Sequence, residues 1–402
     1  MTTRPTNAFG VFPDPGTVIA GELRRVPFVD LRAQYRSIRE EIDEAVLKVL
    51  ESGQFVAGEW VERFEEEFSR SVGACYAVGV GSGTAALELA LRVANVRPGD
   101  EVIVPANSFF ATAEAVSNVG AIPIFADVDA STLHLDVSSV RSVISAKTRA
   151  IVPVHLYGRA MDLEALQALA NSRELVIIED AAQAYGTNIR GVPIGASGRL
   201  TCFSFYPGKN LGAYGDAGAV TSNDSIQAER LRLLRNHGSP RKYEHSIVGT
   251  NSRLDAIQAA ILSVKLRHIS AWNAKRVCHA KTYAKVLEGS LIRIPEIPVN
   301  GEHNFHLFVV RSNERNALMD FLRHRGIETG IHYPVPLHLT EAYQALGFPG
   351  KGTLPVAELL ATEILSLPMY PELGDDELDY VRTALCEFSD AGDKRKKMVR
   401  AF

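Results

Sequence analysis

Seven short apolar runs lie between residues 76 and 221, and segments with helical periodicity separate most of them. The runs are continuous rather than alternating, which is typical of strands that are buried on both faces. Such strands pair into a mostly parallel sheet with helices on both sides. We therefore expect an α/β fold, with strands at 76–80, 101–105, 122–125, 150–154, 175–179, 200–205 and 217–221.

The chain has 402 residues, more than one hydrophobic core usually supports. Residues 1–25 are rich in Thr, Pro and Gly and predict a flexible N-terminal arm. A helix with Ile38, Ile42, Val46 and Leu50 on one face follows and is expected to end at Gly53. A long helical segment at about 254–286 leads out of the strand region. We predict a large domain at 26–265 and a smaller C-terminal α/β domain at 266–402.

Composition narrows the class of protein. The net charge of −4 does not indicate a basic surface for binding nucleic acid or an anionic membrane. No apolar run approaches the about 20 residues that span a bilayer, and the first residues lack the apolar core of a secretory signal. The 4 cysteines are widely spaced, without a C-x-x-C pair. We expect a reduced cytoplasmic protein without a metal site, nucleic-acid partner or membrane contact.

Lys209 stands in a nearly uncharged segment rich in aromatic residues and glycine, Ser204-Phe-Tyr-Pro-Gly-Lys-Asn-Leu-Gly-Ala-Tyr-Gly215. Most lysines are solvated surface residues. Burial beside apolar groups, however, lowers the pKa of an amine, and a neutral amine can form a Schiff base. The buried run that ends in Asp180 favours this second interpretation, because ligands bind at the carboxyl ends of parallel strands. Asp180 could hold a protonated ring nitrogen, or equally cap a helix at 181–185.

Two sequence features that are less specific for a cofactor site precede Asp180. Gly81-Ser-Gly-Thr84 joins an expected strand to an expected helix, which makes either an anion site or a plain helix cap. Phe109 follows another strand end and could stack on a flat cofactor or pack in the core. Together with Asp180 and Lys209, these are the parts that hold pyridoxal 5′-phosphate.

The order of these motifs resembles the DegT/DnrJ/EryC1/StrS family of sugar aminotransferases, which have the fold-type I architecture of pyridoxal-phosphate enzymes. The resemblance runs from about Val26 to Glu387 and rests on Ser52-Gly-Gln-Phe-Val-Ala-Gly58, Gly81-Ser-Gly-Thr84, Pro105-Ala-Asn-Ser-Phe109, Pro153-Val-His-Leu-Tyr-Gly158, Glu179-Asp-Ala-Ala-Gln183, Phe203-Ser-Phe-Tyr-Pro-Gly-Lys-Asn210, Arg235-Asn-His-Gly238 and Asn251-Ser-Arg-Leu-Asp255.

The resemblance implies the catalytic groups and their cofactor contacts. Lys209 would carry the internal aldimine and later shuttle the proton, while Asp180 would pair with the pyridine nitrogen. Gln183 would bond the ring oxygen, and Phe109 would stack on the ring.

The resemblance also implies how the cofactor phosphate is bound. Backbone groups of Gly83 and Thr84, with the Ser204 hydroxyl, would hold it. Asn251 would reach it from the partner subunit, so a homodimer with shared active sites is expected.

The segment His332-Tyr-Pro-Val-Pro-Leu-His338 looks like the subgroup that aminates C-3 of a nucleotide-linked 3-keto-6-deoxyhexose, although it could be only a stiff crossover loop. Gly238-Ser-Pro-Arg-Lys-Tyr243 also resembles those enzymes. By this resemblance glutamate donates the amine in a ping-pong reaction, and a dTDP-linked sugar accepts it for amino-sugar biosynthesis. The sugar contacts expected are Tyr206, Lys242, His332 and Tyr333.

Three alternatives remain beside this hypothesis. Amination at C-4 or of a keto-inositol would use the same family fold. Dehydratases on this fold replace the lysine with histidine, and a regulator without catalysis would be expected to lose Lys209 or Asp180.

The pair His303 and His306 has a spacing that could suggest a metal, but a structural role is favoured. The nucleotide, the sugar stereochemistry and the end product stay open.

Overall fold

The computed structural model describes residues 24–399, except 295, 299–300 and 349. The expected flexible arm at 1–25 therefore lies almost entirely outside the described residues. Within the described part, no helix is long and apolar enough to cross a membrane.

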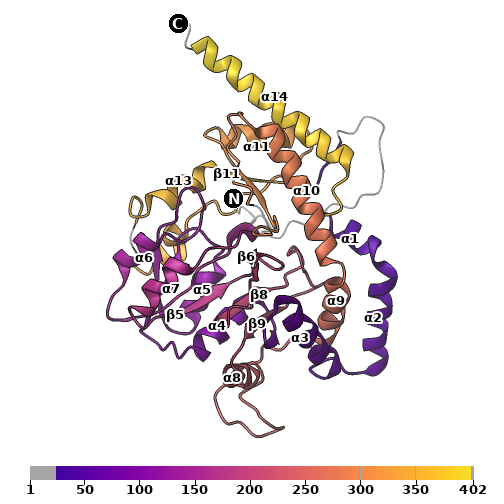
Figure 1. Ribbon diagram of the computed structural model, residues 1–402, viewed down its shortest axis with the longest axis vertical. Coiled ribbons are helices and arrows are strands. Elements are labelled where there is room, and N and C mark those ends of the chain that lie inside the picture. Colours follow the sequence, from indigo (N-terminus) through magenta and orange to yellow (C-terminus); the bar gives the residue numbers. More distant parts are fainter. Residues whose placement is uncertain (1–23, 295, 299–300, 349, 400–402) are drawn as a thin grey trace, which may run out of the picture.

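A mostly parallel seven-stranded sheet forms the centre of the molecule, as predicted (Figure 1). Its strand order is β1-β9-β8-β5-β4-β2-β3, and only β9 runs antiparallel to its neighbours. The connection from β8 to β9 contains no helix, so the chain folds straight back beside β8. The strands are β1 (Tyr76–Val80), β2 (Glu101–Pro105), β3 (Ile122–Ala126), β4 (Thr148–Ile151), β5 (Val176–Asp180), β8 (Leu200–Ser204) and β9 (Gly218–Ser222).

Six of these strands lie within about one residue of the expected runs, and β4 begins and ends earlier. Pro153 has no N–H to donate, and past β4 the pairing with β5 continues only as an isolated bridge between Val154 and Asp180. This bridge still places residue 155 beside the end of β5.

Helices cover both faces of the sheet, because successive residues of each strand point to opposite sides. Val102 and Val104 pack under α4 (Gly83–Val93), α5 (Ala111–Asn118) and α8 (Ser225–Arg235). Ile103 packs on the other face with α6 (Val137–Val143) and α7 (Glu164–Asn171). Farther along that second face, Phe203 packs against α3 (Glu59–Val72) and α9 (Ala256–Leu266).

Two N-terminal helices, α1 (Leu31–Ser37) and α2 (Arg39–Ser52), lie beside α9 (Figure 1). Gly53 ends α2 in the left-handed conformation, φ 65°, as expected. The expected apolar face was wrong at its end, because Leu50 is exposed and Val49 is buried. A spacing of four drifts around a helix of 3.6 residues per turn, so Val49 rather than Leu50 returns to the face of Ile38.

The helical segment expected at 254–286 is two helices, α9 and α10 (Ile269–Leu287), with the break at Arg267 and His268. Beyond it, a third core gathers around the antiparallel pair β10 (Phe308–Arg311) and β11 (Ile364–Leu367). The helices α11 (Arg315–His324) and α14 (Asp375–Val399) cover that pair, and α14 projects outward at its end (Figure 1). The boundary at 265/266 stays a prediction.

Short elements complete the chain. They are η1 (Leu156–Gly158), β6 (Asn188–Ile189), β7 (Val192–Pro193), η2 (Leu337–Leu339), α12 (Glu341–Gln344) and α13 (Pro355–Glu363).

Candidate active site

Lys209 and Asp180 are brought together because their strands are neighbours. Asp180 is the last residue of β5, and Lys209 lies in the loop that follows β8. The loop is closed at its base by the Ala213 N–H, which donates to the Phe205 carbonyl at 2.7 Å. The Lys209 N–H donates to the Tyr206 carbonyl at 2.8 Å, so the lysine sits in a fixed turn.

Burial dominates the electrostatics of this pair. It lowers the pKa of Lys209 to about 8, against the opposing pull of the Asp180 charge. It also raises the pKa of Asp180, although hydrogen bonds from the Ala182 N–H at 3.1 Å and the Thr112 hydroxyl at 2.9 Å act in the opposite direction. Among the described residues, no salt bridge to Asp180 is present. A buried carboxylate without a cationic partner suits a protonated ring nitrogen.

The competing interpretation of Asp180 as a helix cap was wrong. Residues 181–185 form turns and no helix, although the Asp180 side chain does bond the nearby Ala182 N–H.

A charged network that the sequence reasoning missed lies behind Asp180. Because side chains alternate along β5, Glu179 points to the opposite face. Its carboxylate accepts from His155 Nε2 at 2.9 Å and from Arg199 Nε at 2.7 Å, while His155 Nδ1 accepts from the Met161 N–H. Burial alone would raise the pKa of Glu179, but these partners bring it down to about 2. The one available signal was a buried strand that ends in two acids.

Gln183, three residues after Asp180, forms hydrogen bonds to two distant segments, the 3₁₀ turn at 156–158 and the loop 332–338. It is 7% exposed; its Oε1 accepts from the Tyr157 N–H at 2.5 Å, and its Nε2 donates to the Tyr333 hydroxyl at 3.1 Å. The Tyr157 hydroxyl donates to the carbonyl of His332. The sequence-predicted residues Gln183, His332 and Tyr333 therefore meet, and Tyr157 is a further site residue that only the motif 153–158 had touched.

Phe109 is 55% exposed, so the interpretation as a core residue was wrong. Its ring lies 5.7 Å from the ring of Tyr333, at 44°. An exposed aromatic at a strand end, next to a buried polar cluster, can cover a flat ring.

The start of α4 has the features of both interpretations given to the motif at 81–84. Ser82 caps the helix through the Ala85 N–H, so the cap interpretation is also correct. The N–H groups of Gly83 and Thr84 donate to no group among the described residues. A Cβ on Gly83 would lie 2.6 Å from Cβ of Ser204, so only glycine lets the helix approach β8. Free donors at a helix start, beside a hydroxyl, suit a phosphate.

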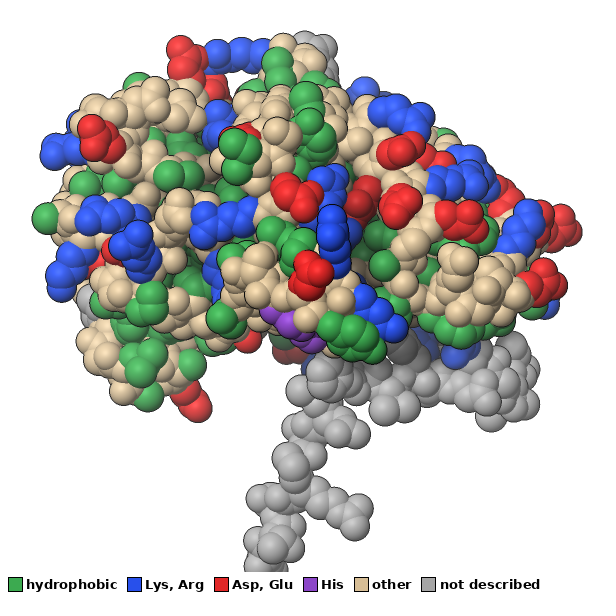
Figure 2. All heavy atoms as spheres, turned by 90° about the horizontal axis from the view of Figure 1, so that it is seen from below, with side chains coloured by type: hydrophobic (Ala, Val, Ile, Leu, Met, Phe, Trp, Pro, Cys, Tyr) green, Lys and Arg blue, Asp and Glu red, His purple; other side chains and the backbone are tan. Residues whose placement is uncertain are grey.

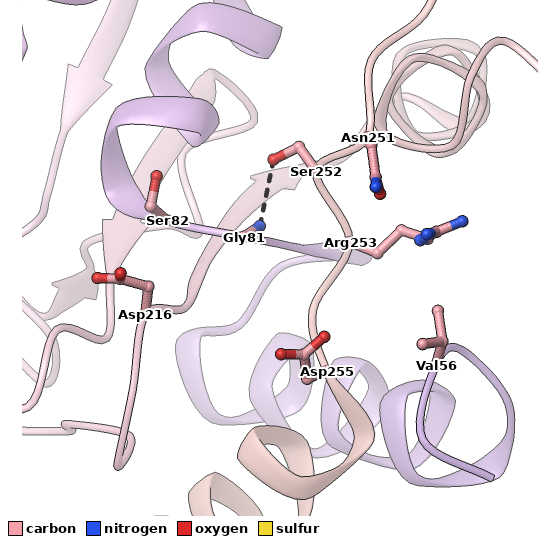
Figure 3. Close-up of a pocket in the computed structure, with 8 residues that line it drawn as sticks. All are labelled: Val56, Gly81, Ser82, Asp216, Asn251, Ser252, Arg253 and Asp255. Carbon is pink, nitrogen blue, oxygen red and sulfur yellow. Dashed lines mark hydrogen bonds between the residues drawn. The ribbon is translucent and has the colours of Figure 1, made fainter.

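Asn251 lines a cavity of about 450 Å³ together with Gly81 and Ser82, the first two residues of the motif at 81–84 (Figure 3). Between two of the residues that line it, the Gly81 N–H donates to the Ser252 hydroxyl at 3.3 Å (Figure 3). The cavity is lined by Val56, Gly81, Ser82, Asp216, Asn251, Ser252, Arg253 and Asp255. The role of Asn251 in a partner's site stays a prediction.

Lys242 is exposed in the loop 237–249, which extends beyond α8 (Figure 1). Its amine lies 5.1 Å from the ring centroid of its neighbour Tyr243. The end of the molecule where this loop lies carries basic and acidic side chains interspersed with apolar ones (Figure 2). Among the described residues, Lys242 forms no hydrogen bond or salt bridge with Lys209 or Asp180. Tyr206, in the loop of Lys209, is 56% exposed.

The two histidines with metal-like spacing make structural contacts. His303 stacks on Phe305 at 3.9 Å, and His306 Nδ1 lies 3.1 Å from Asn210 Oδ1. In the described part of the chain, no group of three or more His, Cys, Asp or Glu side chains could hold a metal ion.

Pyridoxal 5′-phosphate needs a lysine that can lose its proton, a carboxylate for its ring nitrogen, an aromatic cover and donors for its phosphate. The residues at the ends of β5 and β8, with Phe109 and the start of α4, match that need. The chain is therefore of the pyridoxal-phosphate-dependent transferase class.

The model of the DegT/DnrJ/EryC1/StrS aminotransferase family matches residues 36–386, and the chain belongs to this family. A curated relative from Streptomyces venezuelae, dTDP-3-amino-3,4,6-trideoxy-alpha-D-glucose transaminase, is 46% identical over 93% of this chain and 98% of its own length.

Two solved structures support the fold and the cofactor. The crystal structure of S. venezuelae DesV in complex with a ketimine intermediate has a TM-score of 0.89 and 46% identity, over 91% of this chain and 98% of that chain. A Streptococcus pneumoniae protein described as a sugar aminotransferase, solved in its PLP form, has a TM-score of 0.82 and 29% identity, over 88% of this chain and 96% of that chain. The protein is an aminotransferase, and its cofactor is pyridoxal 5′-phosphate.

Proposed function

We propose that this aminotransferase moves an amino group from glutamate to C-3 of a dTDP-linked 3-keto-6-deoxyhexose, a step in amino-sugar biosynthesis. The observation that carries the proposal is the hydrogen bond between Gln183 and Tyr333. It holds the loop 332–338 beside the end of β5, close enough for the charge of Lys209 to act on His332. The S. venezuelae relative, named for a 3-amino sugar, supports the carbon and the nucleotide.

When bound, pyridoxal 5′-phosphate supplies an aldehyde that condenses with amines and a ring that accepts electrons from the neighbouring carbon. Asp180 keeps the ring nitrogen protonated, since its buried charge gains a cationic partner there. The Lys209 amine, with its pKa lowered to about 8, is the base that removes the proton from the carbon bearing the amino group.

The other cofactor contacts orient the ring. Phe109 would cover one face, and Gln183, which Tyr333 holds in place, would bond the ring oxygen. The free N–H groups of Gly83 and Thr84, with the Ser204 hydroxyl, would bind the phosphate.

His332 and Tyr333 bind sugar hydroxyls, with Tyr206 at the entrance. Burial, assisted by the positive charge of Lys209, lowers the pKa of His332 to about 4. The ring is therefore neutral near pH 7, which suits a hydroxyl better than a phosphate. His332 Nδ1 bonds the Ser366 hydroxyl at 2.8 Å, which leaves Nε2 for the ligand.

The active unit is a homodimer whose sites are shared. Val56 lines the cavity of Asn251, and both Val56 and its neighbour Phe55 are about half exposed. Val248, on the loop of Lys242, is 89% exposed. A second copy would cover these side chains while it brings Asn251 to the phosphate and Lys242 to the sugar diphosphate. The protein acts in the cytoplasm, consistent with the four free cysteines of the described chain.

The test determines which carbon of the acceptor receives the amine. The protein is incubated with glutamate and a panel of nucleotide-linked 3-keto and 4-keto sugars and keto-inositols, and NMR locates the new amine. The proposal expects an amine at C-3. An amine only at C-4, or only on the keto-inositol, would contradict it.

A further inference from the structure

A second buried lysine, Lys265, lies at the end of α9. Its side chain is 0% exposed. The amine donates to Gln34 Oε1 at 2.8 Å and to the Gly212 carbonyl at 2.7 Å, and it lies 3.9 Å from the centroid of the Tyr214 ring. The three N–H bonds of the ammonium group can thus point to two acceptors and one aromatic face. In the described part of the chain, Lys265 forms no salt bridge.

Gly212 belongs to the same loop as Lys209, and that loop is tightly folded. A Cβ on Gly212 would lie 2.3 Å from the Pro207 carbonyl oxygen and 2.9 Å from the Tyr206 oxygen. The Lys209 N–H bonds the same Tyr206 oxygen. Gly212 therefore lies directly against Pro207 and Tyr206, and the Tyr206 carbonyl links it to the backbone of Lys209.

Gln34, the other acceptor, comes from α1 and is itself 5% exposed. Lys265 therefore connects three segments that are distant in sequence: α1, α9 and the Lys209 loop. An apolar side chain would fill the same volume but would leave the Gly212 carbonyl buried without a donor, which is unfavourable.

We propose that Lys265 is a positioning residue for Lys209: its amine fixes the Gly212 carbonyl, and with it the loop of the reactive lysine, against Gln34 of α1. This inference rests on the proposed role of Lys209. It goes beyond that role because it assigns the geometry of the reactive lysine to a second lysine on another element.

The test compares Lys265→Met with Lys281→Met, which replaces an exposed lysine of α10. Both variants are loaded with pyridoxal 5′-phosphate, and the visible absorption band is titrated with pH. Lys209→Ala first identifies the band that depends on Lys209. We expect Lys265→Met to shift the pH midpoint of that band by about 0.5 unit or more. We also expect kcat to fall about tenfold, with KM for the sugar unchanged, because the base is misplaced.

Lys281→Met should match the wild type, and Lys265→Gln, which keeps an N–H donor, should recover part of the loss. A folded Lys265→Met protein with the wild-type midpoint and kcat would overturn the inference. If Lys265→Met does not fold, Gln34→Leu decides, since it removes only the α1 acceptor: a shifted midpoint supports the inference, and an unchanged one overturns it. A band that survives in Lys209→Ala would instead contradict the proposed role of Lys209, and the inference with it.

Discussion

The side-chain amide of Gln183 donates to the hydroxyl of Tyr333 at 3.1 Å, and this bond joins the carboxyl end of β5 to the loop that carries the proposed sugar contacts. The same Gln183 accepts from the Tyr157 N–H. One buried side chain therefore links the proposed cofactor contacts to the proposed sugar contacts.

Tyr333→Phe should weaken sugar binding while it leaves the glutamate reaction intact. The lost hydroxyl removes one hydrogen bond, worth about 1 kcal/mol, so KM for the nucleotide sugar should rise about fivefold. Separate measurement of the two half-reactions checks this. An equal loss in the glutamate half-reaction would show that Tyr333 serves the cofactor rather than the sugar.

Asp180→Asn should nearly abolish transamination. The amide has the shape of the carboxylate without its charge, so the ring nitrogen loses the partner that keeps it protonated, and the rate should fall about 10²-fold or more. Stopped-flow measurement of the glutamate half-reaction reports this loss.

Glu179→Gln provides the matched control, because the neighbouring acid points to the opposite face and pairs with His155 and Arg199. It should lower thermal stability and affect the half-reaction much less. Equal rate losses in the two variants would argue against a special role for Asp180.

Gly83→Ala should weaken cofactor binding. The added Cβ would lie 2.6 Å from Cβ of Ser204, so the start of α4 must move away from the proposed phosphate site. Spectrophotometric titration should show an affinity for pyridoxal 5′-phosphate lower by about tenfold or more. Gly374→Ala, where a Cβ meets nothing closer than 3.7 Å, is the control and should bind normally.

Lys265 should make the stability of the fold depend on pH. Burial lowers its pKa from 10.5 to about 7, although the charge of Glu372 opposes this shift. Between these two pH values the unfolded chain binds more protons than the folded one, so folded stability rises with pH.

The contribution of this single group is at most about 1.4 kcal/mol per pH unit. Thermal unfolding of the wild type, Lys265→Met and Lys281→Met from pH 7 to 10 measures it. The wild type should gain stability relative to Lys265→Met as pH rises, and a pH-independent difference would contradict the lowered pKa.

Subunit complementation tests the shared site. Lys209→Ala and Asn251→Ala should each be inactive alone. In a mixed dimer, the site with native Lys209 would receive the native Asn251 of the partner subunit, so activity should return. No recovery in a verified mixed dimer would place Asn251 in its own subunit's site.

The strands and the burial of Lys209 could be predicted from sequence because both leave local patterns. A buried parallel strand is a continuous apolar run, and Lys209 stands out in a segment with few charges. Phe109 was ambiguous because exposure of a strand-end aromatic depends on the loop of Tyr333, which is distant in sequence.

Contacts between segments that are distant in sequence explain the structural features that local patterns could not predict. The break between α9 and α10 leaves Arg267 and His268 each 2.8 Å from Glu41 of α2, a pairing that helical periodicity cannot reveal. The burial of Lys265 leaves no local sequence pattern either, because its partners Gln34 and Gly212 come from two other segments.

The most direct test of the account is to locate the lysine that binds the cofactor. The protein loaded with pyridoxal 5′-phosphate is reduced with borohydride, digested, and mapped by mass spectrometry. The account predicts the added mass on Lys209 and none on Lys265. A modified Lys265, or an unmodified Lys209 in protein that has retained the cofactor, would contradict it.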